Sequence, residues 1–265
     1  MKNYGLIIKS KDPLDFEHKL GASKIHKEIR REDGNWVKDL PDGEIQQRPG
    51  FESFSCVSFG TLNIAEILQW VKFGARSNYS DRFLSTMSET TDQGNDPKKV
   101  AETFRHAGAV PEADWPFTNE TDTFDKFHAS IPLSVRNTGI QWLKDYEIGY
   151  EWVTPTPENL MEELRYSPLG IAVEAWQEKD GLYYGGENPN HWTCLVGFVP
   201  GKHWVVFDSY PETGGSYLKN LAWDYSFKIV MSYSLKKKSQ EEKSWFQNIL
   251  DFLNEIFYEY MKRRY

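Results

Sequence analysis

The sequence predicts an α+β fold, in which helices come first along the chain and strands come later. Apolar residues recur at helical spacing from Cys56 onward, which indicates a largely buried helix. A second helix is expected to begin at Asp96 and Pro97, an N-cap followed by a proline in the first turn, and to stop at Gly108. Another helix is expected before the loop at 93–96, in the stretch that begins NYSDRFLSTM, and a further one at 157–166.

Short runs rich in β-branched and aromatic residues dominate the later part of the chain. Three of them are separated by Gly, Pro and Asn, which are typical of turns, and are expected to form strands at 167–176, 191–199 and 203–210. Strands that follow helices, without regular alternation between the two, favour an α+β arrangement over a series of βαβ units.

The bulk composition indicates a folded globular protein and excludes several classes. The chain has 265 residues, of which 39% are hydrophobic and 26% charged, so it can bury a sizeable core. Its formal net charge of −8 argues against a nucleic-acid-binding protein, which needs a basic face to displace phosphate counterions. Two cysteines and six histidines without metal-ligand spacing predict neither a disulfide framework nor a metal site, and no motif predicts a cofactor.

The chain divides into three parts. Residues 1–35 are expected to be an N-terminal extension, 36–234 a central domain, and 235–265 a charged linker with an amphipathic tail helix. Within the tail, 245–262 places aromatic and aliphatic side chains on one face and acidic ones on the other. This helix could fold back onto its own domain, dock to a protein partner or to its own copies, or lie on a membrane surface.

No segment has the features of a membrane span or a secretion signal. No stretch reaches the roughly 18 consecutive apolar residues that a span requires. The N-terminus has only a four-residue apolar run, which is too short for a signal sequence. We therefore expect a cytoplasmic protein.

Three residues suited to nucleophilic catalysis occur in order along the chain. Cys56 stands where a turn gives way to a helix, and the amides of a helix N-terminus stabilise a thiolate. His191 follows 135 residues later on a predicted strand, and Asp208 comes 17 residues after it. A thiol nucleophile needs a base and a group that orients the base. The alternatives are a buried apolar cysteine, a core histidine and an aspartate that begins a turn.

Five blocks in this order resemble the papain-like, C1-type cysteine peptidases over about residues 36–232. The blocks read SCVSFGTLNIAEIL, YSDRFLSTMSETTDQGND, SPLGIAVEAW, LYYGGENPNHWTCLVGF and WVVFDSY. The resemblance implies a papain-like two-lobed fold, with an N-terminal helical lobe and a C-terminal β-barrel-like lobe. It also implies that Cys56 is the nucleophile, His191 the base and Asp208 the orienting residue. The disulfides usual in the family are missing, and in this respect the chain looks more like the bacterial or bacteriophage branches of the family.

Three positions depart from the family pattern, one of which is Val57, where the family usually has tryptophan after the cysteine. The family usually has a glutamine six residues before the nucleophile, where it donates to the oxyanion, and this chain has Gly50 there. Gln47 is expected to take that role across a longer loop, with Gln46 as the alternative. The orienting residue is Asp208 instead of the usual asparagine, which preserves an acceptor for the imidazole N–H.

The resemblance implies a cysteine peptidase that hydrolyses a peptide or protein substrate through a thioester acyl-enzyme. One alternative is an amidase or acyl transferase that uses the same residues on cell-wall peptides. Another is a catalytically weak or inactive scaffold kept for binding or assembly, including a component of a phage particle, since Gly50 replaces the oxyanion glutamine. A phage-encoded protein could be virion-associated instead of cytoplasmic.

Overall fold

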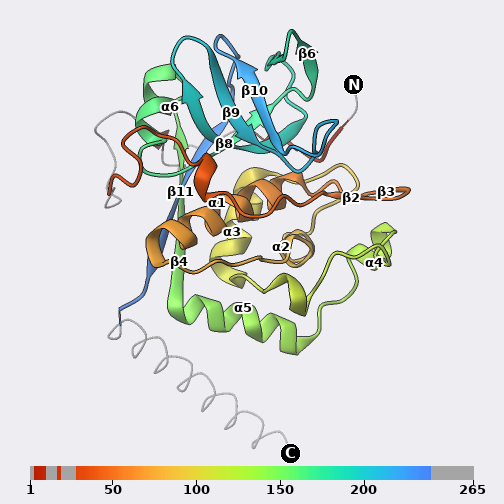
Figure 1. Ribbon diagram of the computed structural model, residues 1–265. Coiled ribbons are helices and arrows are strands. Elements are labelled where there is room, and N and C mark those ends of the chain that lie inside the picture. Colours follow the sequence, from red (N-terminus) through yellow and green to blue (C-terminus); the bar gives the residue numbers. More distant parts are fainter. Residues whose placement is uncertain (1–2, 10–16, 19–27, 240–265) are drawn as a thin grey trace, which may run out of the picture.

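Most helices and most strands lie in different halves of the molecule (Figure 1), in agreement with the α+β prediction. The computed structural model describes residues 3–9, 17–18 and 28–239, and most of its helices lie below the strands in the view of Figure 1. The tail helix expected at 245–262, and part of the linker before it, lie outside the described residues.

The helices include those predicted from the sequence. They are α1 (Cys56–Phe73), α2 (Asp81–Met87), α3 (Pro97–Ala107), α4 (Phe124–Phe127), α5 (Leu133–Asp145) and α6 (Pro157–Glu163), with 3-10 turns η1 (Val37–Asp39) and η2 (Glu112–Asp114). The predicted start of α3 is confirmed, because the Asp96 side chain accepts a hydrogen bond of 3.1 Å from the Lys99 amide. The helix stops at Gly108, whose φ is +73°.

Nine strands of the described residues form one sheet, in the order β1-β4-β11-β5-β8-β9-β10-β7-β6. Their bounds are β1 (Glu17–His18), β4 (Tyr146–Val153), β5 (Leu169–Val173), β6 (Gln177–Lys179), β7 (Leu182–Tyr184), β8 (His191–Val199), β9 (His203–Phe207), β10 (Leu218–Ala222) and β11 (Val230–Lys237). A separate two-stranded hairpin, β2 (Gln47–Arg48) and β3 (Phe51–Glu52), precedes α1. The three strands predicted from the sequence are β5, β8 and β9.

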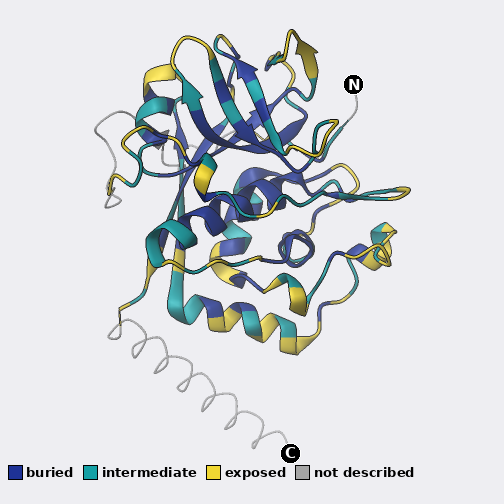
Figure 2. Ribbon diagram, in the orientation of Figure 1, coloured by how far each residue is buried: buried dark blue, intermediate teal, exposed yellow. Residues whose placement is uncertain are grey.

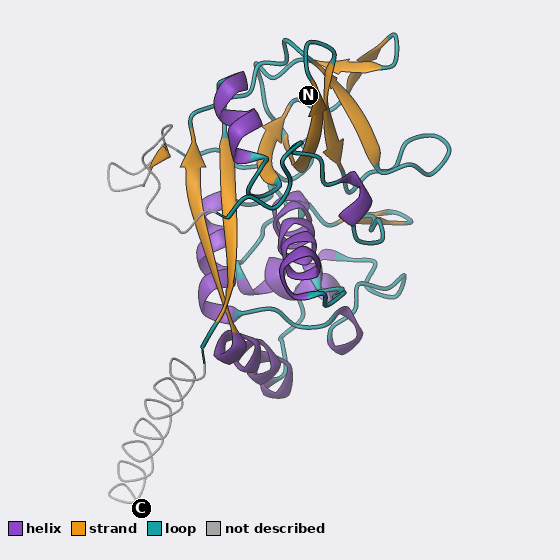
Figure 3. Ribbon diagram, turned by 60° about the vertical axis from the view of Figure 1, so that its left-hand side comes forward, coloured by secondary structure: helices purple, strands orange, loops and turns teal. Residues whose placement is uncertain are grey.

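The long strands β4 and β11 run side by side past the helices (Figure 3). Their antiparallel register places Leu235 opposite Ile148 and ends with Lys237 opposite Tyr146. Residues 235–237 therefore form strand where the sequence interpretation placed linker. The reason is that Leu235 is fully buried, so the alternating pattern of the strand continues through it. None of the described helices is long and apolar enough to span a membrane.

Helix α1 forms the centre of the molecule and is buried along most of its length (Figure 2). It meets the sheet at Trp192, which has no exposed surface and lies between two glycines. A Cβ on Gly60 of α1 would lie 2.8 Å from Cδ1 of the indole, and one on Gly170 of β5 would lie 2.4 Å from its Cζ2. This close approach sets the first turn of α1 against the start of β8.

Gly60→Ala is expected to lower the free energy of unfolding by about 1–3 kcal/mol, because the added methyl group overpacks the contact with Trp192. Alanine favours a helix over glycine by about 1 kcal/mol, and this gain reduces the loss of stability without removing it. Urea unfolding followed by tryptophan fluorescence measures the change. Gly197→Ala is the matched control, because its new Cβ would meet no atom closer than 3.6 Å. Equal stability of Gly60→Ala and the unsubstituted protein would contradict this fit.

Candidate active site

The histidine and the aspartate selected from the sequence meet at one end of the sheet. His191 begins β8, and Asp208 directly follows β9, the antiparallel neighbour of β8. His191 Nε2 lies 2.6 Å from Asp208 Oδ1, and neither side chain has exposed surface. The other ring nitrogen, Nδ1, is buried and has no hydrogen-bond partner among the described residues. The aspartate therefore orients the ring and leaves Nδ1 available for another proton partner.

The second oxygen of Asp208 lies beside a cation. Asp208 Oδ2 is 3.0 Å from Nζ of Lys219, which comes from β10 and is itself 4% exposed. Burial alone would raise the pKa of Asp208, but the adjacent charges of His191 and Lys219 hold that pKa below its ordinary value. Sequence reasoning missed Lys219, because a lysine in a short strand is normally a surface residue.

Cys56 opens α1 next to this pair. The backbone N–H groups of Trp192 and Val57 lie near its sulfur and favour the thiolate, and Trp192 directly follows His191. The thiol therefore lies beside the start of β8, where His191 begins the strand, and it forms no hydrogen bond with His191 Nδ1. The side chain has no exposed surface, and this burial, together with nearby carboxylates, raises the pKa of Cys56 well above its ordinary value.

Gln46, and not Gln47, places its amide at this site. Gln46 is fully buried, and its Oε1 accepts a hydrogen bond of 2.7 Å from Ser209 Oγ. Its Nε2 donates to Glu52 Oε1 at 2.8 Å and to the backbone carbonyl of Tyr4 at 3.1 Å. The Gln47 amide instead donates to Glu52 Oε2 at 2.8 Å, because the two residues pair across the hairpin. The expectation that Gln47 serves the site is thus corrected in favour of Gln46.

The hairpin of β2 and β3 explains how a glutamine so far before Cys56 reaches the site. Gln46 lies ten residues upstream instead of the six expected from the resemblance, which leaves 10 − 6 = 4 extra residues. These fold outward into the hairpin, whose turn contains Gly50 at a φ of +78°. The N–H and the hydroxyl of Ser53 close its base by donating to the Gln46 carbonyl, at 3.3 and 2.7 Å.

The chain's own N-terminal segment, residues 3–9, crosses this site. The Tyr4 amide donates to the carbonyl of Asn190 at 3.1 Å, and its ring lies edge-on to that of His191 with 5.6 Å between the ring centres. The Tyr4 carbonyl takes the Gln46 amide, as described above. A substrate carbonyl that reached Gln46 would need the same place, so the segment and a substrate exclude each other.

Beyond Tyr4 the segment pairs with the main chain of Asn95. The Gly5 carbonyl accepts from the Asn95 amide and the Ile7 amide donates to the Asn95 carbonyl, both at 2.9 Å. Gly5 has a φ of +108°, and a Cβ there would lie 2.1 Å from the carbonyl oxygen of Phe54. The close packing of the segment therefore depends on glycine at this position.

Comparison with known proteins identifies the architecture. No family model and no curated protein sequence matches this chain. Solved structures do match. Xylellain, a cysteine protease from Xylella fastidiosa, is 15% identical with a TM-score of 0.61, and the match covers 89% of this chain and 96% of that chain. The bromelain protease from Ananas comosus in complex with the E64 inhibitor is 19% identical (TM-score 0.57, covering 76% of this chain and 98% of that chain), and digestive procathepsin L 3 of Tenebrio molitor larval midgut is 17% identical (TM-score 0.60, covering 88% of this chain and 76% of that chain). The fold is papain-like.

The papain-like fold confirms the α+β class predicted from the sequence, with its helical lobe and its strand-rich lobe. The three residues selected as catalytic candidates come from both lobes. Cys56 lies on a helix of the first, whereas His191 and Asp208 lie on neighbouring strands of the second. At these sequence identities the similarity concerns the fold, so the roles of the three residues depend on the geometry described above.

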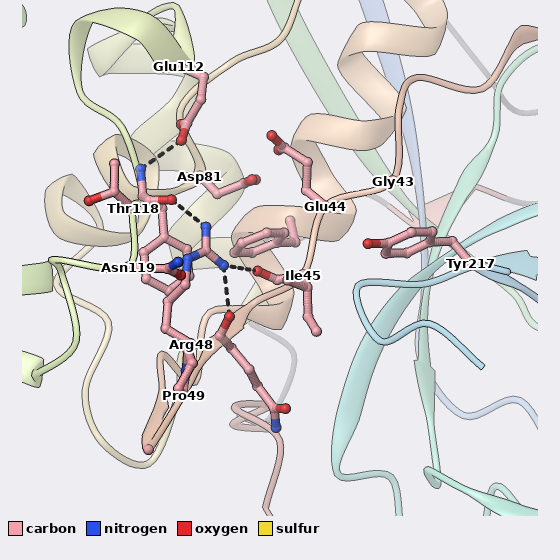
Figure 4. A pocket seen from close by; sticks show the side chains of 14 residues that line it. Gly43, Glu44, Ile45, Arg48, Pro49, Asp81, Glu112, Thr118, Asn119 and Tyr217 are labelled. Carbon is pink, nitrogen blue, oxygen red and sulfur yellow. Dashed lines mark hydrogen bonds between the residues drawn. The ribbon is translucent and has the colours of Figure 1, made fainter. Parts of the chain in front are cut away.

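A separate cavity of this papain-like chain lies beside the segment 43–50. Its volume is about 850 Å³, and none of the three candidate catalytic residues lines it. Figure 4 shows Glu44, Asp81, Glu112 and Arg48 around it. Burial, with the charge of Glu44 adding to it, raises the pKa of Asp81 well above its ordinary value and that of Glu112 to about 7. The described residues contain no group of His, Cys, Asp and Glu suited to a metal ion.

Gly5→Ala is expected to displace residues 3–9 and to speed alkylation of Cys56 by iodoacetamide about tenfold, the equivalent of about 1.4 kcal/mol. The reason is the overlap of the new Cβ with the Phe54 carbonyl, together with a φ that alanine adopts only under strain. Mass spectrometry of the Cys56 peptide as a function of time measures the rate. Gly197→Ala should react like the unsubstituted protein. An unchanged rate in Gly5→Ala would show that the segment does not protect the thiol.

Proposed function

We propose that this protein is a cysteine peptidase, in which Cys56 is the nucleophile, His191 the base and acid, and Asp208 the orienting residue. The arrangement around His191 carries the proposal. Asp208 binds Nε2, and Nδ1, which has no partner among the described residues, is the ring nitrogen left to accept a proton from Cys56, which lies beside the start of β8. The thiol lies at the N-terminus of an 18-residue helix, where the helix amides favour a negative charge.

The polar groups around the thiol support a peptide as the substrate. Gln46 already donates to a peptide carbonyl, that of Tyr4, and an oxyanion in the same place would receive the same hydrogen bond. The carbonyl of Asn190 and both main-chain groups of Asn95 bind the backbone of the N-terminal segment. These groups recognise an extended main chain without regard to its side chains, which favours peptides over other amides.

The proposed reaction follows from these positions. Cys56 gives its proton to His191 Nδ1, and the thiolate attacks the scissile carbonyl carbon while the carbonyl oxygen gains the electron pair and is stabilised by Gln46. The C–N bond then breaks, and His191 returns the proton to the leaving amine. A water molecule loses a proton to His191 and attacks the thioester, which releases the acid and restores the thiol.

We infer that the structure represents a closed state of this site. Burial raises the pKa of Cys56, which favours the protonated thiol, and the neighbouring Gln46 and His191 are in contact with residues 3–9. Their departure would admit water, and the burial that raises this pKa would be relieved in part. We infer that the peptidase acts only after the segment has left the site.

The inactive-scaffold alternative drew its support from Gly50, which stands where the family has its oxyanion glutamine. The position of Gln46, whose amide donates to the Tyr4 carbonyl, supports it as the replacement donor, so the case for an inactive scaffold weakens. The acyl-transferase alternative uses the same first step and differs in the acceptor of the acyl group.

The chain carrying Gly5→Ala is expected to cleave members of a mixed peptide library, and the same chain with Cys56→Ala is expected to cleave none, because the nucleophile is gone. Mass spectrometry of the products identifies the bonds cut. Peptidoglycan fragments tested in parallel distinguish the amidase alternative, which would cleave only these. No cleavage of either, with Cys56 no more reactive than a free thiol, would favour the scaffold.

Gln46→Ala is expected to lower kcat by about 10²–10³-fold in the Gly5→Ala chain, because one donor to the oxyanion is lost. Gln47→Ala is the matched control, and its kcat should change by less than about threefold, since its side-chain amide binds Glu52 across the hairpin and no other group among the described residues. Steady-state kinetics on the best library peptide measures both. Equal losses in the two variants would contradict the assignment of Gln46.

A further inference from the structure

Asp208 carries a charge that the usual asparagine would not, and this charge is buried. Its side chain has no exposed surface, and that of Lys219 is 3% exposed. Apart from the 3.0 Å ion pair with Lys219 Nζ, Asp208 Oδ2 has no polar contact among the described residues. Either charge alone would be costly to bury, whereas the two together form a pair with almost no net charge.

We propose that Lys219 is a positioning residue of the same site: it neutralises Asp208, so that the aspartate acts on His191 as a nearly neutral hydrogen-bond acceptor. In this way Lys219 sets the pH range over which His191 and Cys56 exchange protons. The inference rests on the proposed function only in that it concerns the same histidine and thiol.

The lysine is fixed in this role by its surroundings. Its place on β10 is set by the antiparallel register with β9, where Lys219 lies opposite Val206. Nζ donates a hydrogen bond to the carbonyl of Tyr210 and lies 5.2 Å from the ring centre of Trp176. The Trp176 ring in turn lies edge-on to His191, with 5.7 Å between the ring centres. The ammonium group is therefore enclosed beside the catalytic candidates instead of pointing to solvent.

The direction of the effect follows from the signs of the charges. An Asp208 without Lys219 would stabilise the imidazolium and oppose the thiolate, which moves both proton steps to higher pH. A Lys219 without Asp208 would move both to lower pH. The other titratable groups around the pair are Glu52, Tyr4, Tyr183 and Tyr210. None of these is a cation, so none can replace the charge of Lys219.

Three variants of the full chain test the proposal: Lys219→Met, Asp208→Asn and the double variant. Heteronuclear NMR of the histidine ring nitrogens, assigned with His191→Gln, follows the protonation of His191 as the pH is changed. The midpoint is expected to rise by about one pH unit in Lys219→Met and to fall by a similar amount in Asp208→Asn. In the double variant it should return close to that of the unsubstituted protein, because neither charge remains.

The outcomes separate a positioning role from a structural one. A lysine that only stabilised the fold would lower the melting temperature in Lys219→Met and leave the midpoint unchanged, which would overturn the proposal. If Lys219→Met does not fold, the double variant decides, since it leaves no unpaired charge. A folded double variant with an unshifted midpoint supports the proposal, and an unfolded or shifted one contradicts it.

The readout does not depend on peptide hydrolysis, so the two proposals can fail separately. Midpoints that shift as expected, together with a Gly5→Ala chain that cleaves no peptide, would refute the peptidase and retain the charge pairing of Asp208 and Lys219. Cleavage of peptides with unshifted midpoints would retain the peptidase and refute the charge pairing of Asp208 and Lys219.

Discussion

The hydrogen bond between His191 Nε2 and Asp208 determines what the rest of the site can do. Because it occupies Nε2, only Nδ1 can exchange a proton with a thiol, and the ring cannot rotate to present its other edge. The bond exists because β8 and β9 are antiparallel neighbours, which brings residues 17 positions apart to one end of the sheet. Helix α1 must then place Cys56 at the same end, and the contact of Gly60 with Trp192 allows this.

The parts of this structure that the sequence could predict are those that depend on local patterns. Apolar spacing, the Asp96 cap and the turn residues between β-rich runs are local, and they located α1, α3 and three strands. Helix α5 was missed because only Gly139 and Trp142 of its residues are buried, so no apolar stripe marks it. Cys56, a histidine and an aspartate could be selected by residue type and order, because each belongs to one of these recognisable elements.

The parts that could not be predicted depend on contacts between distant segments. Gln46 reaches the site only because Gln47 pairs with Glu52 in a hairpin of two-residue strands, too short to show an alternating pattern. Lys219 is buried only because β10 pairs with β9, and nothing within its own strand indicates this. The fit of Gly5 depends on a carbonyl 49 residues further on (54 − 5 = 49), that of Phe54.

Two carboxylates lie close to the thiol, and the protein compensates them differently. Asp208 has a cation, whereas Glu52 has four hydrogen-bond donors, which are the amides of Gln46 and Gln47, the N–H of Phe54 and the hydroxyl of Tyr210. Neutral donors leave the charge of Glu52 in place, and that charge raises the pKa of Cys56 further. The same carboxylate holds one N–H of Gln46, so that the other faces the carbonyl to be attacked. The amide is therefore oriented at the cost of a less acidic thiol, and the charge of Lys219 offsets part of the same effect from Asp208.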